Sequence, residues 1–244
     1  MLHEPLSTKS RSESASLVPR VTIDLVLFAL LDEQLQVFTL RRSIPPSTQL
    51  WSLPTAEIDI KQDHSLEQVA LRQLKTLFDQ EGDHKVTYLE QVKTVGNADR
   101  DPKGWSLTVI YYGFMVFDAD QPPMPTEYAQ WQPLESIVHQ KFAFDHQQIL
   151  QESFHRLQSK SLYTSVPVFL LPEFFTLTDL QRAYEIVLGF KVEKKSFRRR
   201  ILEANLLEET DQVRRANHRP AQIYRSIAKT PHIFHRMIEG VRSA

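Results

Sequence analysis

The sequence of 244 residues has no cysteine, only six glycines and no long run of apolar residues. Without cysteine, disulfides, thiolate metal ligands and cysteine nucleophiles are excluded. None of the glycines stands in a GxGxxG or P-loop pattern, which excludes a glycine-rich phosphate loop. No stretch approaches the roughly 18 apolar residues of a membrane span, and residues 1–20 lack the apolar core of a secretory signal. We therefore expect a soluble, cytoplasmic protein with no membrane partner.

Histidine occurs nine times, but not in a metal-binding pattern. There is no HExxH sequence, and His146 and His155 are spaced too unfavourably to share one face of a helix. We expect both to be surface or capping residues. A GxSxG nucleophile elbow is also absent, although composition leaves a Ser-His-Asp set open. The sequence thus predicts no catalytic residue, no metal site and no cofactor.

Charge is distributed unevenly along the chain, although the formal net charge at pH 7 is only −1. Residues 190–244 hold 13 Lys and Arg against 6 Asp and Glu, a net charge of +7. The other residues hold the remaining 16 basic and 24 acidic side chains, a net charge of −8. Such a split favours two functional parts, of which the second faces a polyanion. A solvated basic tail is the alternative, so the sequence pattern has to decide.

Strands and helices are mixed in the first 160 residues. Two β-rich runs, 21–30 and 35–40, flank a short polar stretch and predict a hairpin. A capping-box pattern of Ser65 and Gln68 begins a helix over 65–77. The other elements expected here are strands over 88–95 and 106–117, a loop over 96–105, and helical segments between 135 and 160 interrupted near 142–145. This mixture predicts an α/β or α+β domain.

The pattern changes after the apolar connector 165–175. A second capping-box pattern, Thr178 with Gln181, begins a helix that Gly189 ends. A turn over 190–195 leads to another helix, SFRRRILEANL, and two extended stretches around a basic tip complete the region to residue 226. The helices should pack through apolar side chains, with Phe197, Ile201 and Leu202 facing Leu180, Tyr184 and Val187. This order of helix, turn, helix and hairpin predicts a winged helix-turn-helix.

Basic residues in this region stand where a winged helix meets DNA. The N-terminal end of the second helix reaches base edges when the helix lies in the major groove. Arginine can read guanine through two hydrogen bonds, and lysine or serine can hold phosphate. The candidate DNA-binding residues are Lys194, Lys195, Ser196, Arg198 and Arg199 in the helix and Arg214, Arg215 and Arg219, with His218, at the hairpin tip. A helix pair with a solvated basic face is the alternative; the order of elements favours double-stranded DNA as the partner.

Residues 21–150 resemble a Nudix hydrolase domain with an altered signature. In that family, glutamates of the signature helix hold the divalent cations that polarise a pyrophosphate. Here the usual LPGG reads LPTA at 53–56, and Arg72 is retained. The glutamate positions and the closing glycine carry other residues: His64, Gln73, Thr76, Leu77 and Asp79. Because neutral groups at the metal positions cannot offset the dehydration of Mg²⁺, the resemblance implies a domain that does not hydrolyse pyrophosphates.

With its winged helix, the chain resembles the Nudix-related transcriptional regulators from about Val21 to Ile227. The segment NADRDPKGW, residues 97–105, is similar to that family's RDPRG segment. The resemblance implies an α/β (α+β) Nudix-like sandwich domain followed by a winged helix-turn-helix domain. We expect a flexible tail over 1–18, a sensing and dimerisation domain over 19–158 and the DNA-binding domain over 159–244. Because members bind inverted repeats as dimers and many sense ADP-ribose, the resemblance implies a homodimer, a palindromic operator and a nucleotide or sugar-phosphate effector.

The same resemblance points to a ligand pocket. Candidate ligand-binding residues are Arg41, Arg42, Trp51, Arg72, Asp99, Arg100 and Trp105. The arginines could meet phosphates, the tryptophans could stack on a base, and Asp99 and Arg100 lie on a loop, where function concentrates. Ordinary surface, core or turn roles are the alternatives, and for Arg72 the structural role is favoured. Thr55 and Ala56 replace paired glycines that admit phosphates closely, so a ligand other than ADP-ribose, or none, stays open.

Three functions are compatible with these features. The favoured one is a ligand-responsive transcriptional regulator, most simply a repressor, with a catalytically inactive Nudix-like sensor. The second is a divergent pyrophosphohydrolase using carboxylates that precede the signature helix: Glu57, Asp59 or Asp63. The third is a constitutive DNA-binding regulator whose first domain only dimerises. The sequence identifies neither the operator nor the effector.

Overall fold

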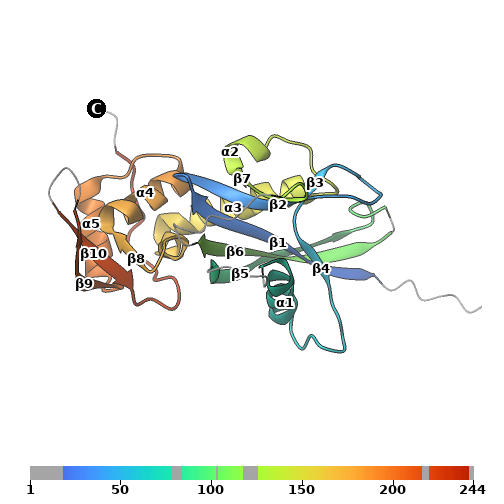
Figure 1. The fold of residues 1–244 in the computed structure, drawn as a ribbon, viewed down its shortest axis with the longest axis horizontal. Coiled ribbons are helices and arrows are strands. Elements are labelled where there is room, and N and C mark those ends of the chain that lie inside the picture. Colours follow the sequence, from blue (N-terminus) through green and yellow to red (C-terminus); the bar gives the residue numbers. More distant parts are fainter. Residues whose placement is uncertain (1–18, 79–83, 103, 118–125, 216–219, 242–244) are drawn as a thin grey trace, which may run out of the picture.

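The computed structural model describes residues 19–78, 84–102, 104–117, 126–215 and 220–241 (Figure 1). The expected tail over 1–18 lies outside the described residues, as do Asp79, His218 and Arg219. The elements, in chain order, are β1 (Arg20–Leu31), β2 (Gln34–Arg41), β3 (Trp51–Ser52), β4 (Thr55–Glu57), α1 (Leu66–Phe78), β5 (His84–Asn97), β6 (Ser106–Phe117), β7 (Ala129–Pro133), α2 (Leu134–Ile137), α3 (His146–Tyr163), the 3₁₀ helix η1 (Val166–Leu170), β8 (Phe174–Thr176), α4 (Leu177–Leu188), α5 (Lys194–Glu203), β9 (Leu207–Arg214) and β10 (Ala221–Ser226). No helix among these is long and apolar enough to cross a membrane.

A seven-stranded sheet forms the centre of the first part of the chain. Its main order is β3-β2-β1-β6-β5, with β4 paired to β1 and β7 paired to β2. The β1–β6 pair is parallel and the others are antiparallel. Helix α1 covers one face, and α2 and α3 lie on the other (Figure 1). The predicted mixed α/β sheet domain is confirmed, although β5 is longer than the expected strand over 88–95.

Strand β1 is apolar on both sides because both faces of the sheet are covered. Alternate residues Ile23, Leu25 and Leu27 pack with the buried side chains of α1, whereas Val26 and Phe28 join the core beneath α3. The core beneath α3 continues into the second part, where it includes residues of α4 and α5. The core beneath α3 is therefore shared by the two parts, whereas the core beneath α1 belongs to the sheet domain alone.

A three-stranded sheet, in the order β8-β10-β9, lies beside α4 and α5 at one end of the molecule (Figure 1). Helix α3 packs against α4 and leads through η1 to β8. The expected domain boundary between residues 158 and 159 falls inside α3, which ends at Tyr163. The predicted order of helix, turn, helix and hairpin is confirmed.

Several local expectations about helix ends need correction. The capping box of α4 is formed by Thr176 and Asp179, two residues before the predicted pair, because Thr178 already lies inside the helix. Helix α5 begins at Lys194, since the Glu193 side chain accepts hydrogen bonds from the Lys195 and Ser196 amides and caps the helix two residues early.

Within the helix pair, the expected contact between Phe197 and Tyr184 is present, with ring centroids 5.0 Å apart. Ile201 is also buried. Leu202 is not: its side chain is 45% exposed, because it projects from the opposite side of α5. The predicted packing is thus correct for two of these three residues.

A polar cluster fastens α3 to the sheet. Glu90 of β5 accepts hydrogen bonds from Lys160 and Arg156 of α3 and from the hydroxyls of Tyr88 and Tyr112. Burial alone would raise the pKa of Glu90, but these hydrogen bonds hold it at about 2. The carboxylate is therefore charged at physiological pH and links β5 of the sheet to α3.

Candidate functional site

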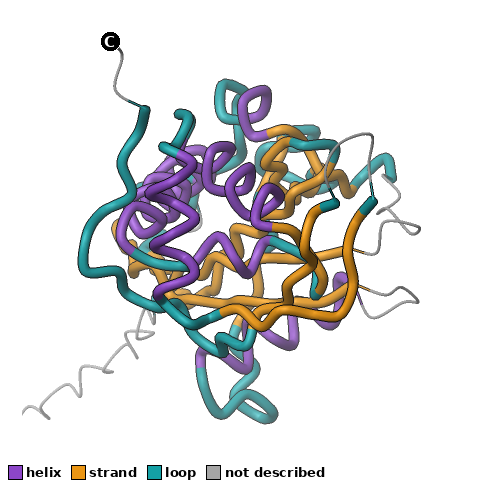
Figure 2. Tube along the Cα trace, turned by 90° about the vertical axis from the view of Figure 1, so that its left-hand side faces the viewer, coloured by secondary structure: helices purple, strands orange, loops and turns teal. Residues whose placement is uncertain are grey.

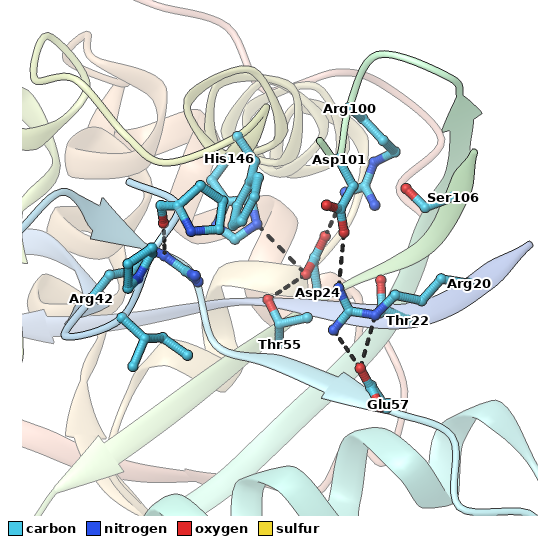
Figure 3. A pocket seen from close by; sticks show the side chains of 14 residues that line it. Arg20, Thr22, Asp24, Arg42, Thr55, Glu57, Arg100, Asp101, Ser106 and His146 are labelled. Atoms are coloured by element: carbon cyan, nitrogen blue, oxygen red, sulfur yellow. Dashed lines mark hydrogen bonds and ion pairs between the residues drawn. The ribbon is translucent and has the colours of Figure 1, made fainter. Parts of the chain in front are cut away.

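A cavity of about 260 Å³ opens at the N-terminal end of β1. Its walls are β1, the loop after β2, β4, the loop before β6 and the start of α3, as Figure 3 shows. The labelled polar side chains around it are Arg20, Thr22, Asp24, Arg42, Thr55, Glu57, Arg100, Asp101, Ser106 and His146. Segments far apart in the sequence thus meet in one polar pocket.

Asp24 and Arg100 form the buried centre of the pocket wall. The Arg100 Nη2 atom lies 3.1 Å from an Asp24 oxygen, and the side chains are 7% and 1% exposed respectively. Arg100 also donates two hydrogen bonds of 3.0 Å to Asp145, which precedes α3. The Thr55 hydroxyl lies 2.6 Å from the other Asp24 oxygen. This arrangement ties the loop before β6 to β1 and to the start of α3.

His146 is buried in the same wall, which corrects the expectation that it is a surface or capping residue. Its Nδ1 atom accepts a hydrogen bond of 2.9 Å from the Leu53 amide, and its Nε2 atom lies 3.8 Å from Asp24. Burial lowers the pKa of His146, although the carboxylates of Asp24 and Asp145 act in the opposite direction. The imidazole is therefore neutral at pH 7, because a proton on Nδ1 would break the bond to Leu53.

Arg20 forms the outer side of the pocket. Its guanidinium donates to Glu57 at 2.8 Å and to Asp101 at 2.9 Å, linking β1 to β4 and to the loop before β6. Arg42 stands across the pocket, with its guanidinium 4.7 Å from the centre of the Phe144 ring. It donates Nε to the Pro46 carbonyl, and its terminal nitrogens donate to no residue that the structure describes. Arg42 therefore keeps donors in the pocket wall that are available to an anion.

The structure places two of the seven expected ligand residues, Arg42 and Arg100, in this pocket. Arg41 instead lies over the ring of Trp51, 5.7 Å from its centroid. Trp105 is 50% exposed and Asp99 lies on the surface loop, and neither contributes to the pocket wall. Sequence reasoning missed Asp24 and His146. For Asp24, the available signal was an aspartate within the apolar strand VTIDLVLF, because buried carboxylates need partners. For His146, the sequence contains no comparable signal.

Arg72 has the structural role that the sequence favoured. It donates 2.9 and 2.7 Å hydrogen bonds to Asp63 and one of 2.8 Å to the Glu57 carbonyl. The hydrogen bonds from Arg72 lower the pKa of Asp63. Asp63 in turn accepts from the Asp59 amide, so the acidic loop before α1 is organised around one arginine. Arg72 thus anchors this loop to the signature helix.

The residues that the resemblance assigns to the positions of metal-binding glutamates lie on or beside α1. Thr76 donates to the Arg72 carbonyl at 3.0 Å, the His64 amide donates to Gln68, and Leu77 packs against the core. Among the described residues, no three His, Asp or Glu side chains gather in a way that could hold a metal ion. Glu57 and Asp63, proposed above as substitute carboxylates, are paired with Arg20 and Arg72.

The winged helix presents basic side chains at the far end of the molecule. Lys194, Lys195 and Arg199 of α5 are exposed, and Ser196 is half-buried. Arg198 turns back toward α4, where it donates a 3.0 Å hydrogen bond to the Thr178 hydroxyl. At the hairpin, Arg214 pairs with Asp179 at 2.8 Å, and Arg215 is exposed. The expected DNA-binding residues that the structure describes thus surround α5, but Arg198 and Arg214 also have partners within the protein.

Known sequences are similar to this chain in both the sheet domain and the winged helix. Residues 167–226 match the family described as the NrtR DNA-binding winged helix domain. The ADPR responsive transcriptional repressor NtrR of Acinetobacter baylyi is 43% identical over 228 residues, which cover 92% of this chain and 89% of that protein. This similarity runs through the sheet domain as well as the winged helix.

Solved structures give the same result. NrtR of Shewanella oneidensis, crystallised with a 27mer DNA, has 38% identity and a TM-score of 0.79 and covers 90% of this chain and 99% of its own. The NUDIX domain of the same protein, crystallised with ADP ribose, has 37% identity and a TM-score of 0.50 and covers 61% of this chain and 94% of its own. The predicted fold, a Nudix-like sheet domain followed by a winged helix, is confirmed.

Proposed function

Because the chain belongs to the NrtR family of Nudix-related transcriptional regulators, we propose that it is a repressor that binds an operator through its winged helix and responds to ADP-ribose. Its Acinetobacter relative is an ADPR-responsive repressor, and the Shewanella structures contain DNA or ADP ribose. This is the first of the three functions that the sequence allowed.

The exposed basic end of α5, beside the β9–β10 hairpin, carries this proposal. Lys194 and Lys195 lie in the first turn of α5, and Arg199 follows one turn later on the same exposed side. A recognition helix meets base edges with its N-terminal residues, so Lys195 and Arg199 are placed to reach the major groove. Arg215 is placed to reach a phosphate from the hairpin. Arg219, which the sequence also assigns to DNA, lies outside the described residues.

We assign neighbouring arginines of α5 to different tasks. Arg199 pairs with Glu203 at 4.0 Å, both side chains are exposed, and such a pair is easily exchanged for DNA. Arg198 bonds to Thr178 and therefore holds α5 against the start of α4. Arg214 holds the hairpin to Asp179 in the same way. Arg199 is thus the base-reading candidate, and Arg198 and Arg214 position the helix and the wing.

The pocket beside Asp24 is the proposed effector site. ADP-ribose carries a pyrophosphate, which needs positive charge and hydrogen-bond donors. Arg42 supplies both, and the hydroxyls of Thr22 and Ser106 lie in the same wall. Arg100 and Arg20 contribute positive charge while remaining bound to aspartate and glutamate. Trp51, Trp105, Asp99, Arg41 and Arg72 lie outside the pocket wall, so their assignment to the ligand has no support from geometry.

The effector should be bound without being cleaved. Pyrophosphate hydrolysis in the Nudix fold needs several carboxylates around a divalent cation. Gln73, Thr76 and Leu77 stand where the resemblance places those carboxylates. The substitute carboxylates Glu57 and Asp63 have arginine partners that neutralise them. A domain that retains the pocket but lacks the metal ligands is suited to sensing.

We also propose that the sensor domain dimerises the protein and that α3 connects it to the winged helix. Two recognition helices related by a two-fold axis match a palindromic operator. Helix α3 begins at the pocket with His146 and ends in the winged helix, and Glu90 fixes its middle to the sheet. An effector that shifts the start of α3 could therefore change the position of α4 and α5.

A titration against genomic DNA fragments that include the chain's own upstream region tests the function. We expect selective binding, weakened by ADP-ribose. Selective binding that ADP-ribose leaves unchanged would refute the effector, and no selective binding at moderate salt would refute the repressor. In parallel, ADP-ribose incubated with Mg²⁺ or Mn²⁺ should stay intact. Turnover that Glu57→Gln abolishes would establish the hydrolase instead.

The neighbouring pair Arg199 and Arg198 provides a matched test of the assignment within α5. Arg199→Ala should weaken operator binding by about 1–3 kcal/mol and relax sequence preference at one position. Arg198→Ala should lower thermal stability by removing the bond to Thr178, while the sequence preference is retained. Fluorescence anisotropy with single-base operator variants measures both. Relaxed preference in Arg198→Ala, with an unchanged preference in Arg199→Ala, would reverse the two roles.

A further inference from the structure

The segment after β10, residues 227–241, wraps around the winged helix on the side away from the hairpin. In Figure 2, which looks onto this end of the molecule, it runs along the left of the helices while β9 and β10 lie to the right. Hydrogen bonds hold it in place: the Phe234 amide donates to the Tyr163 carbonyl at 2.8 Å, and the Val241 amide donates to the Lys191 carbonyl at 2.8 Å. Phe234 and Ile238 are buried. The segment, which lies beyond the matched domain at 167–226, is therefore built into the fold.

A basic groove of about 720 Å³ separates this segment from α5. Arg199 and Arg200 line it from the helix, and His232, His235 and Arg236 line it from the segment. The Arg200 guanidinium donates to the Met237 carbonyl and so joins the two walls. Two glutamates, one from each wall, complete the lining. With three arginines against two glutamates, and two imidazoles besides, the groove carries net positive charge and donors for an anion.

The position of this groove identifies the anion. Arg199 lines the groove and also belongs to the exposed side of α5, so an occupant of the groove touches the recognition surface itself. A helix in the major groove has a sugar-phosphate strand on each side of it. The hairpin is placed to reach the strand on one side, and the segment 227–241 faces the strand on the other.

We propose that residues 227–241 form a second DNA-contacting arm, in which Arg236 and His235 bind a backbone phosphate on the side of α5 opposite the hairpin. The inference rests on the proposed function, because it needs α5 to lie on DNA. The arm is ordered before DNA arrives, since Phe234 and Ile238 anchor it in the core. Binding therefore does not have to order a tail, which would otherwise oppose association.

The test uses the full chain and the operator fragment that the wild-type protein selects. Arg236→Ala and the double variant His235→Ala/Arg236→Ala remove the proposed contacts without touching the buried anchors. Arg225→Ala is the matched control, because Arg225 is an exposed arginine of the same domain at the base of the hairpin, paired with Glu208. Thermal unfolding of each variant verifies that the fold is retained.

Phosphate contacts are counted by the salt dependence of the affinity. Each contact contributes a slope of about −0.9 in log K against log salt, or about fivefold in affinity at roughly 0.15 M salt. Arg236→Ala should therefore make the slope less steep by about 0.9 for each subunit bound. For a dimer, the slope should change by about 1.8 and the affinity should fall about 30-fold. Sequence preference should stay unchanged, because the contact is to the backbone. Arg225→Ala should keep the wild-type slope.

The outcomes separate the arm from the proposed function. The arm alone is overturned if the wild-type chain binds the operator, Arg199→Ala binds it more weakly, and Arg236→Ala has the slope and affinity of the wild type. An equal loss in Arg225→Ala and Arg236→Ala also overturns it, because the effect would then be general charge. A wild-type chain that selects no DNA overturns both proposals.

Discussion

Replacing Arg100 by methionine should destabilise the protein by leaving a buried carboxylate without its cation. Arg100 was expected to bind the effector, but its guanidinium bonds Asp24 at 3.1 Å and Asp145 at 3.0 Å. Asp145 is 18% exposed and can recover water. Asp24 is 1% exposed and would keep the Thr55 hydroxyl at 2.6 Å and the uncharged His146 imidazole at 3.8 Å, but no cation. Removing one partner of such a buried pair costs about 3–5 kcal/mol.

Chemical denaturation in urea with and without Asp24→Asn measures this loss. The Arg100→Met variant should lower the free energy of unfolding by about 3–5 kcal/mol, and Tm by about 6–20 °C for a chain of this size. The double variant Asp24→Asn/Arg100→Met should be more stable than Arg100→Met alone, because it removes the stranded charge. Arg182→Met is the control: its pair with Glu33 is 54% and 64% exposed, so its loss should stay below about 1 kcal/mol.

Two results would refute this reasoning. If Arg100→Met lost less than about 1 kcal/mol, water would reach Asp24 and the pair would not be buried in solution. If the double variant were less stable than Arg100→Met, the loss would come from packing of the arginine side chain and not from the unpaired carboxylate.

Two further predictions concern a helix cap and a buried imidazole. Thr176→Ala should lower the free energy of unfolding, measured in urea, by about 1–2 kcal/mol, because the Thr176 hydroxyl accepts a hydrogen bond from the Asp179 amide at the start of α4. Thr176→Ser keeps the hydroxyl and should lose much less. Equal losses in both variants would show that the methyl group matters instead. Burial lowers the pKa of His146 in the folded state, so below about pH 6.5 the unfolded chain binds a proton at this residue that the folded chain does not bind. The free energy of unfolding should therefore fall as the pH drops below about 6.5, with a slope of at most about 1.4 kcal/mol per pH unit. His146→Gln should remove this part of the pH dependence of unfolding, and an unchanged pH profile would show that other groups cause it.

Local patterns in the sequence determined most of the element order. The alternation and length of apolar runs predicted β1, β2 and β6, and the uneven charge together with the helix, turn, helix and hairpin order predicted the winged helix. Such signals are local, because side-chain periodicity depends on the backbone geometry of a single element. The start of α4 was misplaced by two residues because two threonines stand near it, and only the observed hydrogen bonds choose between them. The start of α5 was misplaced because its cap is a glutamate, Glu193.

The roles of the arginines were decided by the tertiary structure. Arg42, Arg72, Arg100 and Arg198 look alike in the sequence, yet one faces a pocket, two neutralise aspartates and one supports a helix. The partners of Arg72, Arg100 and Arg198 are 9, 76 and 20 residues distant, and no periodicity encodes which side chain the fold will bring near. The placement of the C-terminal segment beside α5 was likewise absent from the pattern, because it depends on backbone hydrogen bonds to Tyr163 and Lys191.

The sequence by itself predicted that this chain carries a Nudix-like sheet domain ahead of a basic winged helix. Those features depend on residue types and on the order of elements along the chain, and both can be seen in the sequence without the fold. Only the tertiary structure decided that Asp24, Arg100 and His146 share one buried wall and that α3 belongs to both parts. Burial and long-range pairing determine the charge state and the partner of each side chain, and both arise when distant segments pack.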